Sequence, residues 1–294
     1  MSRLSALIRR LHERRMAARS PAPPRRFAIF DHVPKTGGTA LNQALLRILT
    51  SEHVAVNRHV DVAAGNLEFA DRYPIISGHF GGAHRRQFQR DRNRLTFTVI
   101  RDPVRRAIST YTYWRHNIPV DSPDFQAPTV QAAKTRSFGA FIRSEEPFIK
   151  INLFNTHVLM LAGPETFDSA CEPECQALYR DKIAALADEF DVIGVTERLP
   201  DTLQCFLTAI GFRAPLKARD LLTRVEKNAS PALDPTEISS ADRAFLAERN
   251  ELDFELHAVA EARLDRLLQA QAEAAIGRLR RLRLLCHRKW NGAS

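Results

Sequence analysis

Long apolar runs are absent from this chain of 294 residues. No stretch approaches the roughly 18 consecutive apolar residues that a membrane-spanning helix needs. The first residues, MSRLSALIRR, lack the apolar stretch and the small-residue cleavage site of a secretory signal. We therefore expect a globular protein that neither spans a membrane nor is exported. Its length is enough for one large domain or two small ones.

Cysteine is scarce, with four residues in the chain. Cys171 and Cys175 have a C-x3-C spacing, but no cluster of cysteine and histidine follows that would complete a zinc site. Free thiols in a reducing compartment are the first interpretation, and a local disulfide between these two residues stays open. We expect no metal site.

Acidic residues are almost missing from the two ends of the chain. Residues 1–26 carry eight arginines and one acid, and residues 278–294 carry five arginines, one lysine and no acid. Because the whole chain has a net charge of +9, residues 27–277 have a net charge of −4. Basicity confined to the ends argues against a nucleic-acid-binding body. We expect a flexible basic tail at each end of one domain spanning residues 27–277. Amphipathic helices on an anionic membrane are the alternative for the tails.

The body of the chain alternates short apolar runs with helical patterns. Strand-like runs are found at 26–33, 73–80, 95–101 and 190–197. Helical patterns are found at 39–49, 103–116, 137–145, 150–161, 174–189, 199–211 and 251–276. Asp102 suits the N-cap of the second of these helices. Residues 119–131 are expected to form a loop that borders a pocket. The alternation predicts an α/β, three-layer fold with a central, mostly parallel sheet of four to five strands flanked by helices.

Residues 34–39, Pro-Lys-Thr-Gly-Gly-Thr, join the first predicted strand to the first helix. A turn of this kind can direct several backbone N–H groups at one anion, and the helix adds the positive end of its dipole. Lys35 adds a charge, and Thr36 and Thr39 add hydroxyl groups. The nucleoside-triphosphate loop reads G-x-x-x-x-G-K-[ST], with the lysine after the glycines. Here the lysine precedes them, and no carboxylate stands where a magnesium ligand should be. A degenerate kinase or ATPase is therefore only an alternative.

A second anion-binding pattern lies in TVIRDPVRRAISTYTYW, residues 98–114. Arg101 ends a predicted strand and Ser109 lies two turns into the next helix. A guanidinium fork and a hydroxyl so placed can reach one phosphate. Arg105 and Arg106 are interpreted as an exposed helix face. Three aromatic residues of the same helix are expected to pack against the core: Tyr111, Tyr113 and Trp114.

The two motifs, HVPKTGGTAL and about 60 residues later RDPVRRAISTYTYW, resemble the sulfotransferase superfamily, whose fold is P-loop-like. Weaker similarities point to its carbohydrate-type branch, which includes the uronyl 2-O-sulfotransferases of glycosaminoglycans. They are ISGHF (76–80), NLFNTHVLMLAG (152–163), VIGVTERL (192–199) and KNAS (227–230). The resemblance implies transfer of the sulfuryl group of 3′-phosphoadenosine 5′-phosphosulfate (PAPS) to a hydroxyl by in-line displacement. PAP is the product, and no metal is needed.

The resemblance also implies a role for each matching residue. The first motif would hold the 5′-phosphosulfate with Lys35, Thr36, Gly37, Gly38, Thr39 and Ala40. Arg101 and Ser109 would hold the 3′-phosphate. Lys35 would also stabilise the bridging oxygen, as a charge or as a proton donor. Thr196, Glu197 and Arg198 either contact the cofactor or cap the next helix. Lys227, Asn228 and Ser230 either close over the nucleotide or form a solvated turn.

The acceptor hydroxyl needs a base, and His79 is the first candidate because of its GHF context. A histidine of ordinary pKa, about 6.5, can accept a proton at neutral pH. The alternative for His79 is a strand-end histidine bonded to a backbone carbonyl. His84 is the second candidate base, Glu68 is a third, and His32 is expected to orient the loop.

The sequence thus predicts a PAPS-dependent sulfotransferase acting on a carbohydrate or glycoconjugate, without a nucleic-acid partner. A bacterial-style cytoplasmic location is expected, with peripheral contact to an anionic membrane through the basic tails. A lipid-linked or surface glycan, a small saccharide and a peptide tyrosine stay open as acceptors. An inactive membrane-docking or nucleic-acid-docking protein of the same fold is the second alternative.

Overall fold

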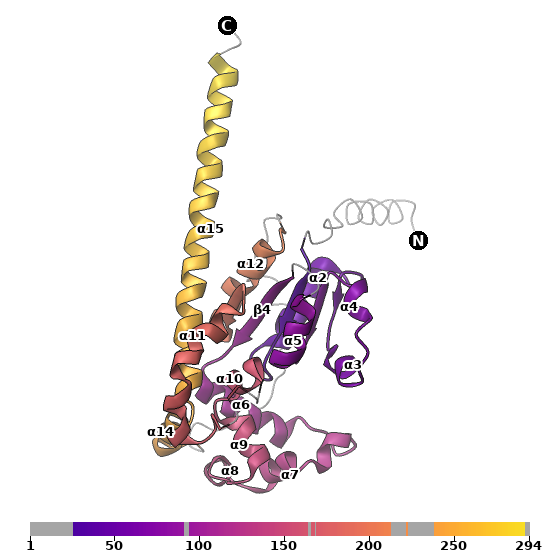
Figure 1. Ribbon diagram of the computed structural model, residues 1–294, viewed down its shortest axis with the longest axis vertical. Coiled ribbons are helices and arrows are strands. Elements are labelled where there is room, and N and C mark those ends of the chain that lie inside the picture. The colour runs from indigo at the N-terminus through magenta and orange to yellow at the C-terminus, as the bar shows by residue number, and fades with distance from the viewer. Residues whose placement is uncertain are drawn as a thin grey trace, which may run out of the picture.

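The computed structural model describes residues 26–90, 94–163, 166–167, 169–212, 222 and 238–291, with side chains left aside at 89–90 and 278–291. It is an α/β structure with a central five-stranded sheet flanked by helices (Figure 1). The strands are β1 (Ala28–Asp31), β2 (Val54–Ala55), β3 (Ile75–Gly78), β4 (Leu95–Ile100) and β5 (Val192–Val195). All are parallel, in the order β2-β3-β1-β4-β5. The predicted fold class is confirmed.

The strands are buried on both faces of the sheet, as parallel strands usually are. Ile29 of β1 pairs with Ile76 of β3 and with Thr96 of β4. On one face, Phe30 and Phe97 join the larger hydrophobic cluster. On the other face, Ile29 and Ile76 join a second cluster with Phe80 and Phe88. These two cores make the three layers of the fold.

The helices differ from prediction mainly in number and bounds. They are α2 (Gly38–Leu49), α3 (His59–Ala63), α4 (Phe69–Arg72), α5 (Gly81–Arg90), α6 (Pro103–His116), η1 (Pro123–Gln126), α7 (Pro128–Thr135), α8 (Phe138–Ile142), α9 (Pro147–Leu153), α10 (Thr156–Ala162), η2 (Pro173–Tyr179), α11 (Arg180–Asp188), η3 (Thr196–Arg198), α12 (Leu199–Ala209), α14 (Ser240–Glu248) and α15 (Glu251–Asn291). The helix predicted at 150–161 divides into α9 and α10 because Asn155 has a left-handed backbone (φ 45°). The loop predicted at 119–131 contains η1 and the start of α7.

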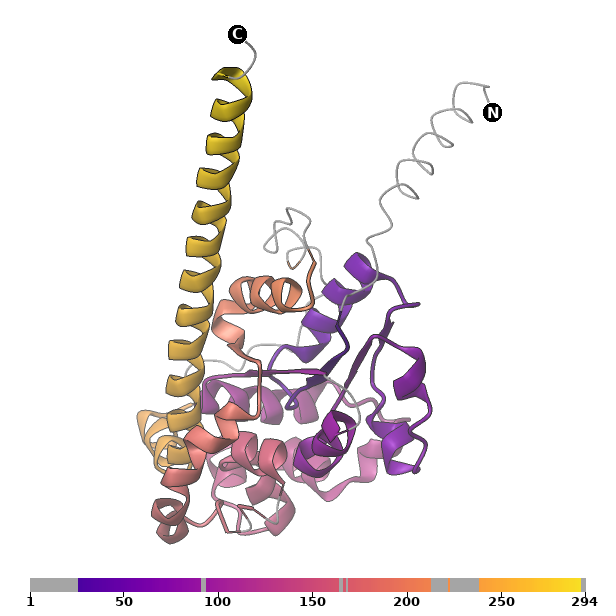
Figure 2. The same ribbon diagram turned by 45° about the horizontal axis from the view of Figure 1, so that its top comes forward.

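Helix α15 is far longer than the predicted 251–276. Leu252, Leu256, Ala260 and Leu264 are completely buried and follow each other every four residues, so they form the ridge that faces the body. Beyond this ridge the helix stands clear of the body (Figures 1 and 2), and Ile276 is half exposed. The basic stretch predicted as a separate tail from residue 278 therefore begins as a continuation of α15. Residues 1–25 lie outside the described residues.

Two expectations drawn from missing features can be compared with the structure. In the part of the chain that is described, none of the helices has both the length and the apolar composition to cross a membrane. Cys171, Cys175 and Cys205 are free thiols, so the disulfide left open between the first two is not formed.

Candidate anion-binding and proton-transfer site

The candidate site lies at the edge of the sheet where all five parallel strands end. His32 follows β1, His79 follows β3 and Arg101 follows β4. Thr196 follows β5, and His59 begins α3, which comes after β2. The strand order therefore places the other two histidines on one side of His32, which begins the β1 loop, and the arginine on its other side. This is the edge at which open α/β sheets commonly bind ligands.

The loop after β1 has the backbone of an anion-binding turn. Lys35 (φ 70°) and Gly37 (φ 85°) are both left-handed, which is typical of concavities formed by successive backbone N–H groups. Helix α2 starts directly after them, with no side-chain cap and no acidic residue in its first turn. Its N–H groups and the positive end of its dipole are thus available to an anion. Gly38 is required here, because a Cβ would lie 1.8 Å from the His32 ring.

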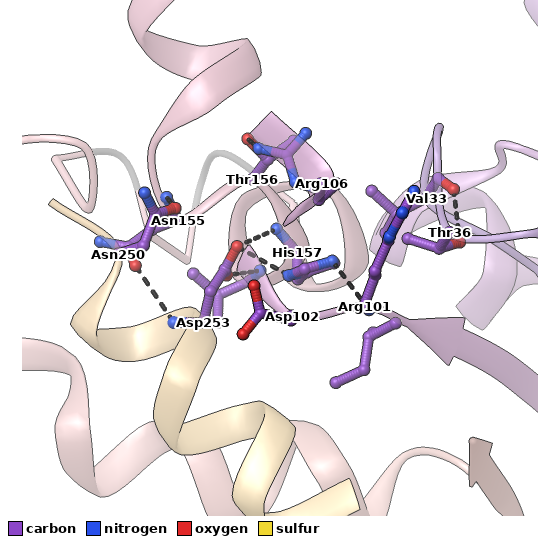
Figure 3. Close-up of polar contacts among 12 residues, drawn as sticks. Val33, Thr36, Arg101, Asp102, Arg106, Asn155, Thr156, His157, Asn250 and Asp253 are labelled. Atoms are coloured by element: carbon purple, nitrogen blue, oxygen red, sulfur yellow. Dashed lines mark hydrogen bonds and ion pairs between the residues drawn. The ribbon is translucent and has the colours of Figure 1, made fainter. Parts of the chain in front are cut away.

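Side-chain hydrogen bonds hold this loop together and connect it to the ends of β4 and β5. The Thr36 hydroxyl donates to the Val33 carbonyl at 2.7 Å (Figure 3). The Thr196 hydroxyl lies 2.6 Å from the Thr36 carbonyl and 2.9 Å from that of Ile100. The hydroxyls of Thr36 and Thr196 therefore shape the loop, a role that the sequence did not assign to Thr196.

Lys35 carries a charge that no carboxylate balances in the described part of the chain. Its Nζ lies 3.7 Å from the centroid of the Tyr113 ring on α6. Burial, and to a lesser degree the charge of Arg101, lowers the pKa of Lys35 to about 8. The sequence had placed Tyr113 in the core; that prediction is wrong, because the ring supports the ammonium group instead.

Arg101 connects the two motifs. Its Nη1 donates to the Lys35 carbonyl at 3.2 Å. Its Nε is buried and has no hydrogen-bond partner among the described residues. Burial lowers the pKa of Arg101, and the nearby Glu197 opposes that shift. Ser109 lies on the same face of α6 as Tyr113, four residues before it, so Lys35, Arg101 and the Ser109 face of α6 come together.

Arg106 is not on an exposed helix face as predicted, whereas Arg105 is exposed. The Arg106 side chain is almost completely buried. It donates to the carbonyls of Asn152 (3.0 Å) and Leu153 (3.1 Å) and to the Thr156 hydroxyl (2.7 Å). Arg106 therefore satisfies the carbonyl end of α9 behind the site. An arginine in a polar helix pattern gives no sequence signal of such burial.

Three imidazole rings, tilted against each other, form a cluster at the other end of the edge. The centroid of the His79 ring lies 4.3 Å from that of the His32 ring and 4.9 Å from that of the His59 ring. His32 also stacks on Phe30 at 4.8 Å. Burial lowers the pKa of His32 to about 3 and also lowers the pKa of His59. His32 and His59 are therefore neutral neighbours of His79.

The hydrogen bond of His79 fixes its tautomer. Its Nδ1 is in short contact with the backbone carbonyl of His32. Because a carbonyl oxygen only accepts, Nδ1 carries the hydrogen, and the neutral ring has its lone pair on Nε2. The bond to a carbonyl and the capacity to act as a base, considered as alternatives from sequence, are compatible in this geometry.

The other candidate bases are placed differently. His84 lies in α5, and its Nδ1 bonds the carbonyl of Phe80, the residue just before that helix, at 3.0 Å. The Glu68 side chain is 85% exposed and lies 3.8 Å from Arg72. Neither forms a described contact with the loop or the imidazole cluster. Across the described residues, no group of three or more His, Cys, Asp or Glu side chains could hold a metal ion.

The remaining predicted residues lie at the margin of the site or outside the described chain. Arg198 pairs with Asp201 at 3.0 Å and with Asp265 at 2.5 Å. Glu197 accepts a hydrogen bond from the Asp102 backbone N–H at 3.2 Å. Thr39 is exposed and Ala40 is partly exposed in the first turn of α2. Lys227, Asn228 and Ser230 lie outside the described residues.

Comparison with known proteins gives no family. No family model matches the chain, and no curated protein matches it significantly. The sulfotransferase resemblance stays a prediction carried by the motifs and by the geometry of the site.

Proposed function

We propose that this protein is a PAPS-dependent sulfotransferase that acts on a hydroxyl of a carbohydrate or glycoconjugate. One observation carries the proposal. Lys35 and Arg101 meet at an uncapped helix start, neither is in an ion pair among the described residues, and His79 stands nearby with a free Nε2. This arrangement has the cations and the base that sulfuryl transfer needs.

The residues fit a nucleotide with phosphate groups at two separate positions. The first turn of α2 and Lys35 would hold the 5′ end, together with Thr36, Gly37, Gly38, Thr39 and Ala40. Arg101, whose buried Nε has no partner among the described residues, would hold the 3′-phosphate with Ser109. When bound, PAPS supplies the sulfuryl group and a phosphate leaving group.

Lys35 is suited to a position where negative charge grows. A pKa of about 8 keeps most of the lysine protonated at neutral pH, yet makes its proton easier to give up than that of an ordinary lysine. An ammonium already partly removed from water interacts more strongly with an anion than one in bulk solvent. Lys35 can therefore stabilise a leaving oxygen as a charge or as a proton donor.

His79 is suited to take the proton of the acceptor hydroxyl. The proton would go to Nε2, since Nδ1 already carries a hydrogen directed at the His32 carbonyl. That carbonyl would also stabilise the imidazolium that forms, because both ring nitrogens then act as donors. His32 has a pKa of about 3, so it does not compete for the proton.

Calorimetric titration with PAP, in buffer with a chelator, tests the proposal. The full chain should bind PAP with a dissociation constant on the order of micromolar, about −8 kcal/mol. Lys35→Ala and Arg101→Ala should each weaken binding at least tenfold, because each removes a charge-assisted contact. Arg72→Ala is the matched control, since it removes an exposed positive charge far along the chain from both motifs.

Two results would contradict the proposal. One is no binding of PAP by the unaltered protein. The other is binding of ATP that requires magnesium and exceeds that of PAP, which would favour the kinase or ATPase alternative.

A further inference from the structure

A carboxylate on helix α15 lies behind Arg101, the arginine of the second anion-binding motif. Asp253 of α15 and His157 of α10 are both completely buried, and Asp253 Oδ2 lies 2.7 Å from His157 Nδ1 (Figure 3). The same carboxylate accepts the backbone N–H groups of His157 and Val158, each at 3.0 Å. Asp253 thus caps the first turn of α10 from a helix distant in sequence.

Arg101 is the next residue in this series of contacts. Its backbone N–H donates to His157 Nε2 at 3.4 Å. His157 therefore carries its hydrogen on Nδ1, toward Asp253, and its lone pair on Nε2, toward Arg101. Burial lowers the pKa of His157, so the ring is neutral. Burial disfavours ionisation of Asp253, but His157 and Arg106 outweigh it, and the pKa of Asp253 is lowered.

A pair of asparagines keeps the two helices in register. The Asp253 backbone N–H donates to Asn155 Oδ1 at 3.1 Å, and the Asn155 N–H donates to Asn250 Oδ1 at 2.8 Å. Both asparagines are completely buried. Because the contacts of Asp253 and His157 are buried and continue to the Arg101 N–H, a shift of α15 would reach the end of β4.

We propose that Asp253 and His157 are positioning residues that fix Arg101 for its phosphate. The inference rests on the proposed function, because it assumes that Arg101 binds the 3′-phosphate of the donor. It assigns α15, which contributes no residue to the loop itself, a part in nucleotide affinity.

Asp253→Asn separates this role from a general loss of packing. The amide keeps the size of the carboxylate but places a donor against the His157 donors. His157 can relieve this clash by moving its hydrogen to Nε2, where it meets the Arg101 N–H. Affinity for PAP should then fall roughly tenfold. Affinity for adenosine 5′-phosphate, which lacks the 3′-phosphate, should change much less.

The calorimetric experiment compares both nucleotides on four proteins: unaltered, Asp253→Asn, Arg101→Ala and the double variant. The double variant should bind PAP no more weakly than Arg101→Ala alone, because Asp253 acts through Arg101. Glu255→Gln is the matched control, since Glu255 lies on the same helix and pairs with the exposed Arg180. Two results would overturn the inference. One is an equal loss of affinity for both nucleotides in Asp253→Asn. The other is a loss of PAP affinity, on adding Asp253→Asn to Arg101→Ala, as large as the loss that Asp253→Asn causes alone.

A second measurement does not depend on the variant folding or on PAP. Nitrogen-15 NMR of the imidazoles in the unaltered protein should show His157 protonated at Nδ1 and not at Nε2. Protonation at Nε2 would remove the link to Arg101 and overturn the inference. Failure of the unaltered protein to bind PAP would instead defeat the proposed function, and the tautomer would still decide whether the link exists.

Discussion

Lys35 lies where its positive charge destabilises the fold. Its pKa of about 8 in the folded protein is below its ordinary value of 10.5, so the folded state releases the proton first. The cost of burying the charge is therefore fully present below pH 8 and disappears as the pH rises from 8 to 10.5. Residues that cost stability are typical of binding sites.

We predict that Lys35→Met is more stable than the unaltered protein near neutral pH and does not bind PAP. The gain should be on the order of 1 kcal/mol, after allowance for the partial exposure of the ammonium group. The thioether can still pack on the Tyr113 ring.

Denaturant unfolding of both proteins across this pH range measures the effect. The difference in free energy of unfolding should shrink as the pH rises toward 10.5. A variant that is less stable at every pH would show that the contact with Tyr113 outweighs the buried charge.

The strand, loop and helix formed by β1, residues 32–37 and α2 act as one element. We predict that Gly38→Ala disrupts it, because the new Cβ would lie 1.8 Å from the His32 ring. Moving that ring would also shift the carbonyl that holds His79. The free energy of unfolding should fall by about 1–3 kcal/mol, and PAP affinity should fall with it.

Thermal unfolding and calorimetry check this prediction. Gly277→Ala is the control, because nothing lies within 4 Å of its Cβ and it is inside α15. There, alanine should keep or slightly raise stability. Normal PAP affinity in Gly38→Ala would mean that the loop tolerates displacement of His32.

The elements were predictable where a local pattern defines them. β1, β3, β4 and β5 are apolar runs next to turns, and Asp102 caps α6 as predicted, accepting the Arg105 N–H at 2.8 Å. β2 has two residues and α3 has five, too few for a periodic signal. Helix α5 reads as polar because Arg85, which shares its buried face with Phe88, is completely buried against Asp31 (3.0 Å). Only the tertiary partner makes that arginine a core residue.

At the scale of the whole molecule, both basic ends leave from the edge opposite the candidate site. β1 starts at that edge, so the residues before it are attached there. The first turn of helix α15 carries Asp253, which is linked through His157 to Arg101. The helix then runs along α12, where Gln271 lies 3.3 Å from Thr208, and continues beyond the body (Figures 1 and 2).

We predict that removing residues 278–294 leaves the melting temperature and PAP affinity unchanged, because α15 is already exposed over residues 272–277, just before the deletion, apart from a half-buried Ala275. Binding to vesicles with anionic lipid should weaken, and added salt should weaken it further in the full chain. Vesicle co-sedimentation measures this, with neutral vesicles as the control. Equally poor binding by full and trimmed chains would rule out the membrane role.

The sequence by itself determined the parallel sheet and the glycine-containing turn after β1, and it identified Lys35 and Arg101 as candidates to bind an anion. Each depends on neighbours in the chain: apolar runs, glycines in a turn, and an arginine at a strand end. Tertiary structure decided the cluster of His32, His59 and His79 and the link from Asp253 through His157 to Arg101. These residues belong to separate strands and helices, and only the strand order and the packing of α15 bring their side chains within reach of each other.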